Sequence, residues 1–309
     1  MRLVRWGWSE YETPNVPGLP AGVELVIAEG ASAPLESADM LVVPSTVRVD
    51  AAAVRRLGRC RLVLTTTSGF DQLDLDALAS AGIAVARLPL PRRDAVVESA
   101  LGMMLALTRR LGRFQQAAVE NRWERPRLAD YGATLLGTVG VVGVGVIGTR
   151  MVEVLETLGA RVLRCDPLLA DGVSLDELLA ASDVVTLHCE LTAENRGMIG
   201  AREIARMRRG AVLVNTARGK LVDVDAAVAA IRSGQLAGLG LDVFPKEPTD
   251  LDRYADPRIF VTPHAAGWHP ALGEKIVEGI VEAASALVQG REIPFVVTPM
   301  TGATSASNQ

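Results

Sequence analysis

The chain contains only three histidines, and their positions are the first indication of chemistry. His188 ends the apolar stretch that begins at Asp183, and His264 follows the segment Phe260-Val-Thr-Pro263. Both histidines therefore come at the carboxyl ends of predicted strands, which is the edge where open α/β sheets bind ligands. A histidine titrates near neutral pH and can exchange a proton with a substrate at such an edge. Taken singly, each could instead be a hydrogen-bonded polar residue.

Two further polar segments follow predicted strands in the same way. One reads Asn215-Thr-Ala-Arg218-Gly219, and the other reads Leu241-Asp242-Val-Phe-Pro-Lys-Glu247-Pro248. A lone arginine is usually a surface charge, and Glu-Pro is an ordinary loop sequence. Because the carboxyl ends of parallel strands meet at one edge, the joint arrangement indicates a site.

A glycine-rich segment supplies the clearest binding motif. The apolar run Val139–Val142 leads into Gly143, Gly145 and Gly148, spaced G-x-G-x-x-G, and an apolar segment at helical spacing follows. A second apolar run ends at Asp166, which is 18 residues beyond Gly148. These glycines suit a tight turn, a close approach of backbone to a pyrophosphate, and close packing of helix on strand. The carboxylate suits the hydroxyls of an adenosine ribose, so we predict a dinucleotide site.

Strand-like and helix-like segments alternate around these motifs, which favours parallel sheets covered by helices. The first part of the chain has strand candidates at residues 23–28, 40–43, 62–66 and 83–86, with helices near 50–57 and 73–81. Residues 94–123 have a long helical pattern, interpreted either as a core helix or as a subunit contact. The second part has six strand candidates, at residues 139–142, 161–165, 183–187, 211–215, 239–241 and 258–261. Helices are predicted near residues 175–180, 203–207, 225–233 and 272–288, and residues 301–309 are expected to fray.

Composition narrows the class of protein. The 309 residues are 49% hydrophobic, with a net charge of −4 and three cysteines in no metal-ligand spacing. This charge argues against broad nucleic-acid binding, and no apolar run approaches the ~20 residues of a membrane-spanning helix. No apolar segment of signal-peptide type is found near the N-terminus. We therefore expect a cytoplasmic protein with reduced thiols, no metal site, no nucleic-acid partner and no membrane partner.

The motifs together resemble the D-isomer-specific 2-hydroxyacid dehydrogenase family. The resemblance runs from about Thr65 to Gly267. It comprises Ser-Gly-Phe-Asp71, Glu98, the glycine motif with Asp166, Leu-His-Cys-Glu-Leu-Thr192, Asn-Thr-Ala-Arg-Gly219, Leu-Asp-Val-Phe244, Glu-Pro248 and Thr-Pro-His-Ala-Ala-Gly267.

The resemblance implies a fold of two Rossmann-like or flavodoxin-like parallel-sheet domains with an active-site cleft between them. Residues 1–92 and 268–309 would form the substrate-binding domain, and residues 93–267 the NAD-binding domain. The implied reaction is hydride transfer between NAD(H) and a D-2-hydroxy acid/2-keto acid pair, with this small molecule as the partner. A homodimer is expected.

The resemblance also assigns roles to individual residues. The implied catalytic residues are Arg218, Glu247 and His264: the histidine would exchange the proton, the glutamate would favour imidazolium, and the arginine would hold the substrate carboxylate. The implied cofactor-binding residues are Gly143, Gly145, Val146, Ile147, Gly148, Asp166, His188, Glu190, Thr192, Thr216, Ala217, Arg218, Asp242 and His264. The implied substrate-binding residues are Ser68, Gly69, Arg92, Arg218 and His264.

Asp166 favours NAD over NADP, because a carboxylate repels a 2′-phosphate. Arg164 precedes it and should point away by strand alternation.

Several residues depart from the family pattern. Glu190 stands where proline is common, and Trp268 follows the histidine motif where small or hydroxyl residues are frequent. The pair Arg92-Arg93 comes before Glu98, where the family often has glycine or asparagine. The two arginines are either a solvated helix start or a recognition element for a second anionic group on the substrate.

A second class of function also fits the fold. The chain could be an NAD(H)-sensing protein without turnover, similar to the transcriptional corepressors of this family. The intact set of Arg218, Glu247 and His264 argues against it, because sensing requires only the dinucleotide site.

Overall fold

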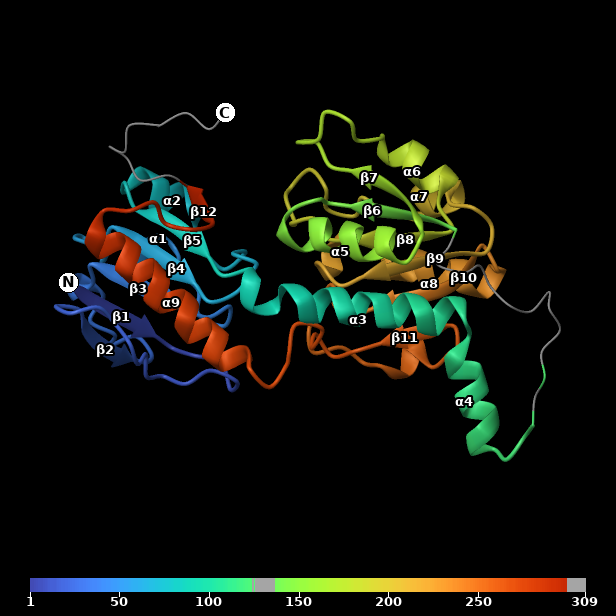
Figure 1. The fold of residues 1–309 in the computed structure, drawn as a ribbon, viewed down its shortest axis with the longest axis horizontal. Helices are drawn as coiled ribbons and strands as arrows, with labels where there is room; N and C mark the ends of the chain where they lie inside the picture. Colours follow the sequence, from blue (N-terminus) through green and yellow to red (C-terminus); the bar gives the residue numbers. More distant parts are fainter. Residues whose placement is uncertain (124, 126–136, 299–309) are drawn as a thin grey trace. The chain divides into compact units, whose positions relative to one another are not determined.

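The computed structural model describes residues 1–123, 125 and 137–298, and the predicted fraying of residues 301–309 lies outside them. Contacts divide the chain into two compact units. The first consists of Met1–Arg92 with the chain from His269 onward, and the second of Arg93–Trp268. Trp268, predicted to belong with the first unit, thus lies in the second. Each unit has one six-stranded sheet with covering helices, so the α/β fold is confirmed (Figure 1).

The first sheet is parallel except for one edge strand. Its order is β2(Glu24–Ala28)-β1(Arg2–Trp6)-β3(Met40–Val43)-β4(Leu62–Thr65)-β5(Ala84–Arg87), with β12(Val296–Thr298) antiparallel beside β5. The five parallel strands have the flavodoxin-like order 2-1-3-4-5. Strand β1 was not predicted, because its sequence Arg-Leu-Val-Arg-Trp contains two charged residues. Arg5 is nevertheless fully buried in it.

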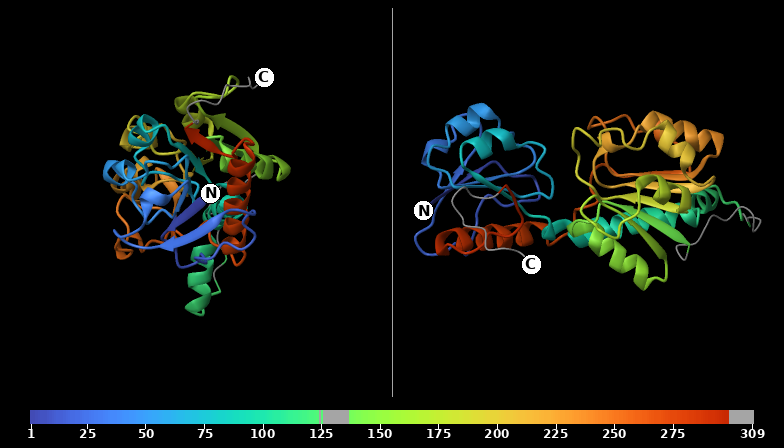
Figure 2. Two further views of the ribbon diagram at one scale, coloured as in Figure 1. Left: turned by 90° about the vertical axis from the view of Figure 1, so that its left-hand side faces the viewer. Right: turned by 90° about the horizontal axis from the view of Figure 1, so that it is seen from above.

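Alternate residues of this sheet enter two separate cores, as expected for strands covered on both faces. Met40, Val42, Leu62 and Leu64 pack with α9(Leu272–Gln289). The intervening Leu41, Val43 and Val63 pack with α1(Ala51–Arg55), α2(Leu75–Ser80) and the 3₁₀ turn η1(Leu35–Ser37). The right-hand view of Figure 2 shows α9 in red on one face and the blue helices on the other.

The second sheet is parallel throughout. Its order is β7(Arg161–Cys165)-β6(Thr138–Val142)-β8(Val184–Leu187)-β9(Ala211–Asn215)-β10(Leu236–Leu241)-β11(Ile259–Val261). All six predicted strands are therefore present. The strand order reverses between β6 and β8, and the carboxyl ends at such a switch point form a ligand crevice.

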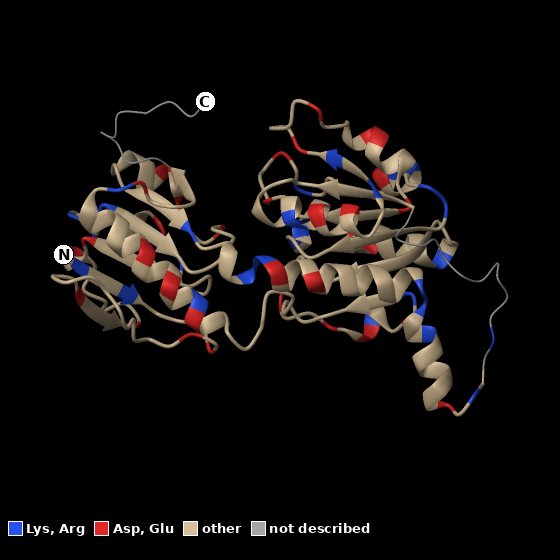
Figure 3. Ribbon diagram, in the orientation of Figure 1, with Lys and Arg blue, Asp and Glu red and all other residues tan. Residues whose placement is uncertain are grey.

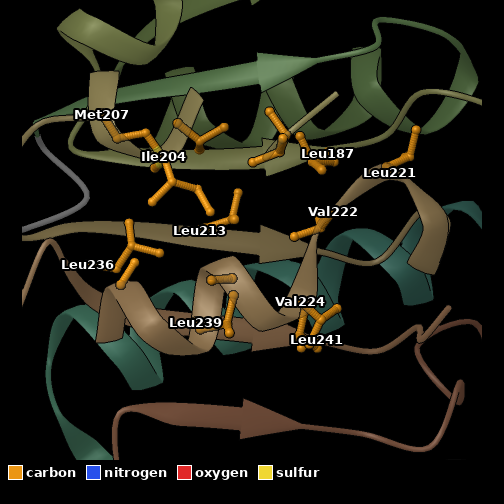
Figure 4. Packing of buried hydrophobic residues seen from close by; sticks show 14 of the residues in the cluster. Leu187, Ile204, Met207, Leu213, Leu221, Val222, Val224, Leu236, Leu239 and Leu241 are labelled. Carbon is orange, nitrogen blue, oxygen red and sulfur yellow. The ribbon is translucent and has the colours of Figure 1, made fainter. Parts of the chain in front are cut away.

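Two groups of helices cover the second sheet. One face carries α6(Leu175–Ala181), α7(Ala201–Arg206) and α8(Val224–Ser233), whose core is shown in part in Figure 4. The other face carries α3(Leu90–Thr108) and α5(Val146–Thr157). Short 3₁₀ turns, η3(Gly219–Leu221) and η4(Asp252–Tyr254), follow β9 and precede β11.

The long helical pattern of residues 94–123 is two helices. Helix α3 begins four residues earlier than predicted, and the chain breaks at Arg110, whose φ is 54°, before α4(Leu111–Val119). Met103 and Leu107 pack against Gly240 and Gly238 of β10, where a side chain on the strand would crowd the helix. The core interpretation therefore accounts for the buried side of α3, and the subunit contact stays a prediction.

Candidate active site

The glycine turn after β6 forms as its motif predicts. Gly143 has a φ of +86°, and a Cβ there would collide with the backbone of Cys189. A Cβ on Gly148 would collide with the carbonyl oxygen of Gly143. Gly145 differs, because its Cβ would meet nothing within 4 Å. No described side chain caps the start of α5 at Val146. The turn thus presents open backbone and the positive end of a helix dipole, which suits a phosphate group.

Asp166, directly after β7, is held against this turn. Its Oδ2 accepts a hydrogen bond of 2.7 Å from the Val144 N–H, and its Oδ1 accepts one of 2.9 Å from the Leu168 N–H. Arg164 is paired instead with Asp171, at 2.6 Å. Among the described residues, no arginine forms an ion pair with Asp166. Strand alternation is not the reason, and that expectation is wrong, because residues two apart, such as Arg164 and Asp166, share one face of a strand.

The end of β8 lies beside the same glycine turn. The His188 N–H donates to the carbonyl of Val142 at 2.7 Å, and the His188 Nε2 lies 3.0 Å from the Thr186 hydroxyl. Burial lowers the pKa of His188 to about 4, so its ring is neutral at neutral pH. Glu190 and Thr192 follow on an exposed turn, in which Thr192 exchanges hydrogen bonds with Asn195. His188 lies against the turn, because its Cβ would be 3.5 Å from a Cβ on Gly148.

The loop after β9 sets the position of Arg218. The buried Asn215 side chain accepts from the Ala217 N–H at 3.0 Å and donates to the Arg218 carbonyl at 2.9 Å. The Arg218 Nη1 also donates to the Ala217 carbonyl at 2.7 Å. The Thr216 hydroxyl is buried and has no hydrogen-bond partner among the described residues, so it is a polar group that a bound cofactor could satisfy.

Gly219 brings this loop against the loop after β10. A Cβ on Gly219 would overlap the backbone of Phe244. The two backbones are therefore in direct contact, and no residue with a side chain fits between them. This contact places Arg218 beside the segment that carries Glu247, three residues beyond Phe244.

Asp242 organises the loop that carries His264. Its buried Oδ1 accepts hydrogen bonds from the Thr262 hydroxyl at 2.6 Å, the Ala265 N–H at 2.8 Å and the Ala266 N–H at 3.1 Å. Its backbone carbonyl accepts from the His264 N–H at 2.8 Å. His264 has a φ of +56°, a backbone conformation uncommon for a residue with a side chain. No pattern in the sequence indicates this structural role of Asp242.

His264 and Glu247 form the central hydrogen bond of the site. The His264 Nδ1 lies 2.7 Å from the Glu247 Oε2, while the Glu247 Oε1 accepts from the Phe244 N–H at 2.8 Å. The imidazole side chain remains 54% exposed. The glutamate is therefore fixed at both oxygens, and the histidine ring is held by it at one nitrogen.

Charges around this pair shift both pKa values. The hydrogen bond to Glu247 raises the pKa of His264 from its ordinary 6.5, against the opposing effects of burial and of the Arg218 charge. Burial alone would raise the pKa of Glu247, but hydrogen bonds from His264 and Phe244 and the Arg218 charge lower it overall. Arg218 acts electrostatically on both groups. The structure thus brings the three predicted catalytic residues together within the second unit.

The remaining predicted substrate residues lie in the first unit, at the carboxyl end of β4. The Ser68 carbonyl accepts from Arg87 at 3.0 Å, and the Gly69 carbonyl accepts from the Thr67 hydroxyl at 2.8 Å. Arg92, at the start of α3, donates to the Thr66 carbonyl at 2.6 Å. Arg92 is buried, so the interpretation as a solvated helix start is wrong for it.

Two further features are absent from the part of the chain that the structure describes. No group of three or more His, Cys, Asp or Glu side chains there could hold a metal ion. No helix among those residues combines the length and apolarity needed to cross a membrane.

The backbone contact at Gly219 is tested by the variant Gly219→Ala. The added methyl group must displace Phe244, so we expect the free energy of unfolding in urea to fall by about 1–3 kcal/mol, as for other overpacked sites. The matched control is Gly102→Ala, because Gly102 lies in α3 and a Cβ there meets nothing within 4 Å. Equal stabilities for the two variants would contradict the contact.

The pKa shift at His264 can be read by NMR titration of the three imidazole rings. Glu247→Gln removes the negative charge that raises the His264 pKa, so the pKa should fall toward or below 6.5. The imidazolium form, populated below this pKa, is then lost at a lower pH than in the wild type. His188 is an internal control whose low pKa should not change. An unshifted His264 pKa would show that the hydrogen bond has little effect in solution.

Comparison with known proteins agrees with this geometry. Residues 101–266 match the sequence model described as "D-isomer specific 2-hydroxyacid dehydrogenase, NAD binding domain". D-3-phosphoglycerate dehydrogenase of Mycobacterium leprae is 31% identical over 276 residues, which are 86% of this chain but 52% of that protein. The chain thus spans about half the length of such relatives. Glycerate dehydrogenase of Methylorubrum extorquens is 32% identical over 267 residues, 83% of this chain and 85% of that protein.

A solved structure is similar over nearly the whole chain. D-lactate dehydrogenase from Aquifex aeolicus, determined with NAD and lactic acid, superimposes with a TM-score of 0.80 at 29% identity, covering 93% of this chain and 96% of that one. The relatives described here are dehydrogenases, and they give no support to the corepressor alternative. From its matched domain and from relatives covered over most of their length, the chain belongs to the D-isomer specific 2-hydroxyacid dehydrogenase family, with an NAD-binding domain in its second unit.

Proposed function

We propose that the chain catalyses the reversible, NAD(H)-linked interconversion of a D-2-hydroxy acid and its 2-keto acid. The observation that carries this proposal is the hydrogen bond of 2.7 Å between His264 and Glu247, beside the charge of Arg218. A site that only senses NAD(H) has no need for an imidazole with a raised pKa. The names of the relatives indicate small 2-hydroxy acids as the substrate class.

Each of the three side chains has a defined role in this reaction. His264, as imidazolium, donates a proton to the carbonyl oxygen of the 2-keto acid and takes it back in the oxidative direction. Glu247 stabilises the positive ring. Arg218 binds the substrate carboxylate through its guanidinium fork and polarises the reacting carbonyl. The bound nicotinamide supplies the hydride in reduction and accepts it in oxidation.

The features around the glycine turn fit the cofactor. The open backbone at Gly145 and the uncapped start of α5, with Val146, Ile147 and Gly148, would bind the pyrophosphate. The Asp166 carboxylate would accept hydrogen bonds from the ribose hydroxyls, which would replace its present hydrogen bond from the Val144 N–H. The unpartnered Thr216 hydroxyl would meet the nicotinamide half. The other proposed contacts of the cofactor are His188, Glu190, Thr192, Ala217 and Asp242.

In this proposal the first unit contributes to substrate binding. The Ser68-Gly69 loop follows β4 at the carboxyl edge of its sheet, which is where ligands bind in such folds. The Ser68 hydroxyl is buried without a partner among the described residues, so it is available to a substrate oxygen.

The proposal is tested by NADH oxidation with a panel of 2-keto acids, including pyruvate, hydroxypyruvate, glyoxylate and phenylpyruvate. We expect kcat/KM for the preferred substrate to fall about 10²–10⁴-fold in His264→Asn, because proton donation is lost. Binding of NADH, followed by fluorescence, should persist in that variant. Tight NADH binding by the wild type without turnover of any 2-keto acid would favour the sensor instead.

We also propose that the chain forms a homodimer. Its support is a group of exposed apolar side chains along the α3–α4 segment, ending in Trp123, which is 93% exposed; the others are Leu105, Leu111 and Val119. Figure 1 shows α4 directed away from the sheet of its unit. Light scattering should give twice the chain mass for the wild type and a smaller mass for Leu111→Glu/Val119→Glu. A monomeric wild type would contradict the proposal.

A further inference from the structure

A buried network of polar side chains lies at the carboxyl edge of the first sheet. The Arg5 Nη2 donates to the Glu12 Oε2 at 2.8 Å, and the Glu12 Oε1 accepts from the Thr66 hydroxyl at 2.7 Å. The Thr66 carbonyl in turn accepts from the Arg92 Nη1 at 2.6 Å. The Arg92 guanidinium carbon lies 5.2 Å from the centre of the Tyr11 ring. Two arginines from different elements, β1 and α3, thus belong to one network.

Several donors of this network have no partner. The Nε and Nη1 of Arg5 and the Nη2 of Arg92 are buried and form no hydrogen bond with any described residue. The Ser68 hydroxyl, two residues beyond Thr66 in the sequence, is also buried and without a hydrogen-bond partner among the described residues. Native proteins satisfy the great majority of their buried polar atoms. All of these atoms can donate a hydrogen bond. A group of donors of this kind suits an anionic oxygen group, which accepts hydrogen bonds.

The charges of this network also favour a bound anion. Glu12 balances Arg5, but Arg92, only 8% exposed, has no carboxylate within 4 Å among the described residues. Arg92 also lies in the first turn of the 19-residue helix α3, where the helix dipole disfavours a cation. Figure 3 shows charges of both signs at this helix start. A buried, unbalanced cation is stabilised by an anion.

The neighbouring Arg93 lacks these properties. It pairs with Asp94 at 3.0 Å, and its side chain is 35% exposed. The structure therefore separates two arginines that are adjacent in sequence. The Arg93 guanidinium pairs with the neighbouring Asp94 carboxylate at the surface. The Arg92 guanidinium belongs to the buried network instead.

We propose that Arg92, supported by Arg5 and Ser68, binds the second anionic group of a dianionic substrate. This inference rests on the proposed function and narrows its substrate class to 2-keto acids that carry a further carboxylate or a phosphate monoester. A guanidinium fork pairs with either group through two parallel hydrogen bonds. Ordered water is the alternative occupant of the site.

The kinetic test compares substrates that differ in the second charge. The full chain is assayed with a dicarboxylic 2-keto acid (oxaloacetate), a phosphorylated one (phosphohydroxypyruvate) and a monoanionic one (2-ketobutyrate). In Arg92→Gln, kcat/KM for the dianionic substrates should fall roughly 10- to 100-fold relative to 2-ketobutyrate, mainly through KM, because a charge-assisted hydrogen bond is lost. Arg93→Gln should leave this ratio unchanged. The substrate with the larger loss identifies carboxylate or phosphate as the ligand.

A binding test separates this inference from the proposed function. Malonate and inorganic phosphate are titrated into the chain by calorimetry, without cofactor, and melting curves check that each variant is folded. We expect the wild type and Arg93→Gln to bind one of the anions at least tenfold more tightly than Arg92→Gln, with Arg92→Lys between them. If no 2-keto acid is turned over, the proposed function fails, and this binding comparison alone decides on Arg92. An unchanged substrate ratio, or equal anion binding by wild type and Arg92→Gln, would mean that water occupies the site and would overturn the inference.

Discussion

The buried carboxylate of Asp242 is the anchor on which the candidate active site depends. One of its oxygens accepts three hydrogen bonds from the loop after β11, and its carbonyl accepts a fourth from His264 itself. Because Asp242 directly follows β10, these bonds fix the histidine relative to the sheet rather than to a loose surface segment. The unusual φ of His264 is sustained by the same bonds, as expected for a residue in a sparsely populated backbone region.

The charges of the site are balanced against one another. Glu247 favours the positive form of His264, while Arg218 disfavours it and favours the negative form of Glu247. Gly219 makes this balance possible, because the backbone contact with Phe244 holds the arginine loop against the loop that carries the glutamate. A substrate carboxylate bound to Arg218 would offset the opposing charge of the arginine, so substrate binding and protonation of His264 would favour each other.

The sequence predicts those parts of the fold and site that depend on local patterns. The glycine turn, Asp166 and His264 could be placed in advance because each follows an apolar strand within three residues. Strand β1 could not, because burial of Arg5 depends on Glu12 seven residues later. The break at Arg110 could not be placed either, because Arg110 is neither glycine nor proline and the nearby Gly112 lies inside α4. Arg92 and Arg93 are identical in type, and only tertiary structure shows which one is buried.

The hydrogen bond between Glu247 and His264 determines which ring nitrogen of the histidine carries the proton. A carboxylate with a lowered pKa can only accept hydrogen bonds, so the Nδ1 atom that faces it must carry a hydrogen in both charge states of the ring. The neutral imidazole is therefore confined to a single tautomer, with its lone pair on Nε2. In the proposed reaction, proton transfer in either direction would then take place at Nε2 alone. Because one atom would serve as both acid and base, the ring would not need to flip between catalytic cycles.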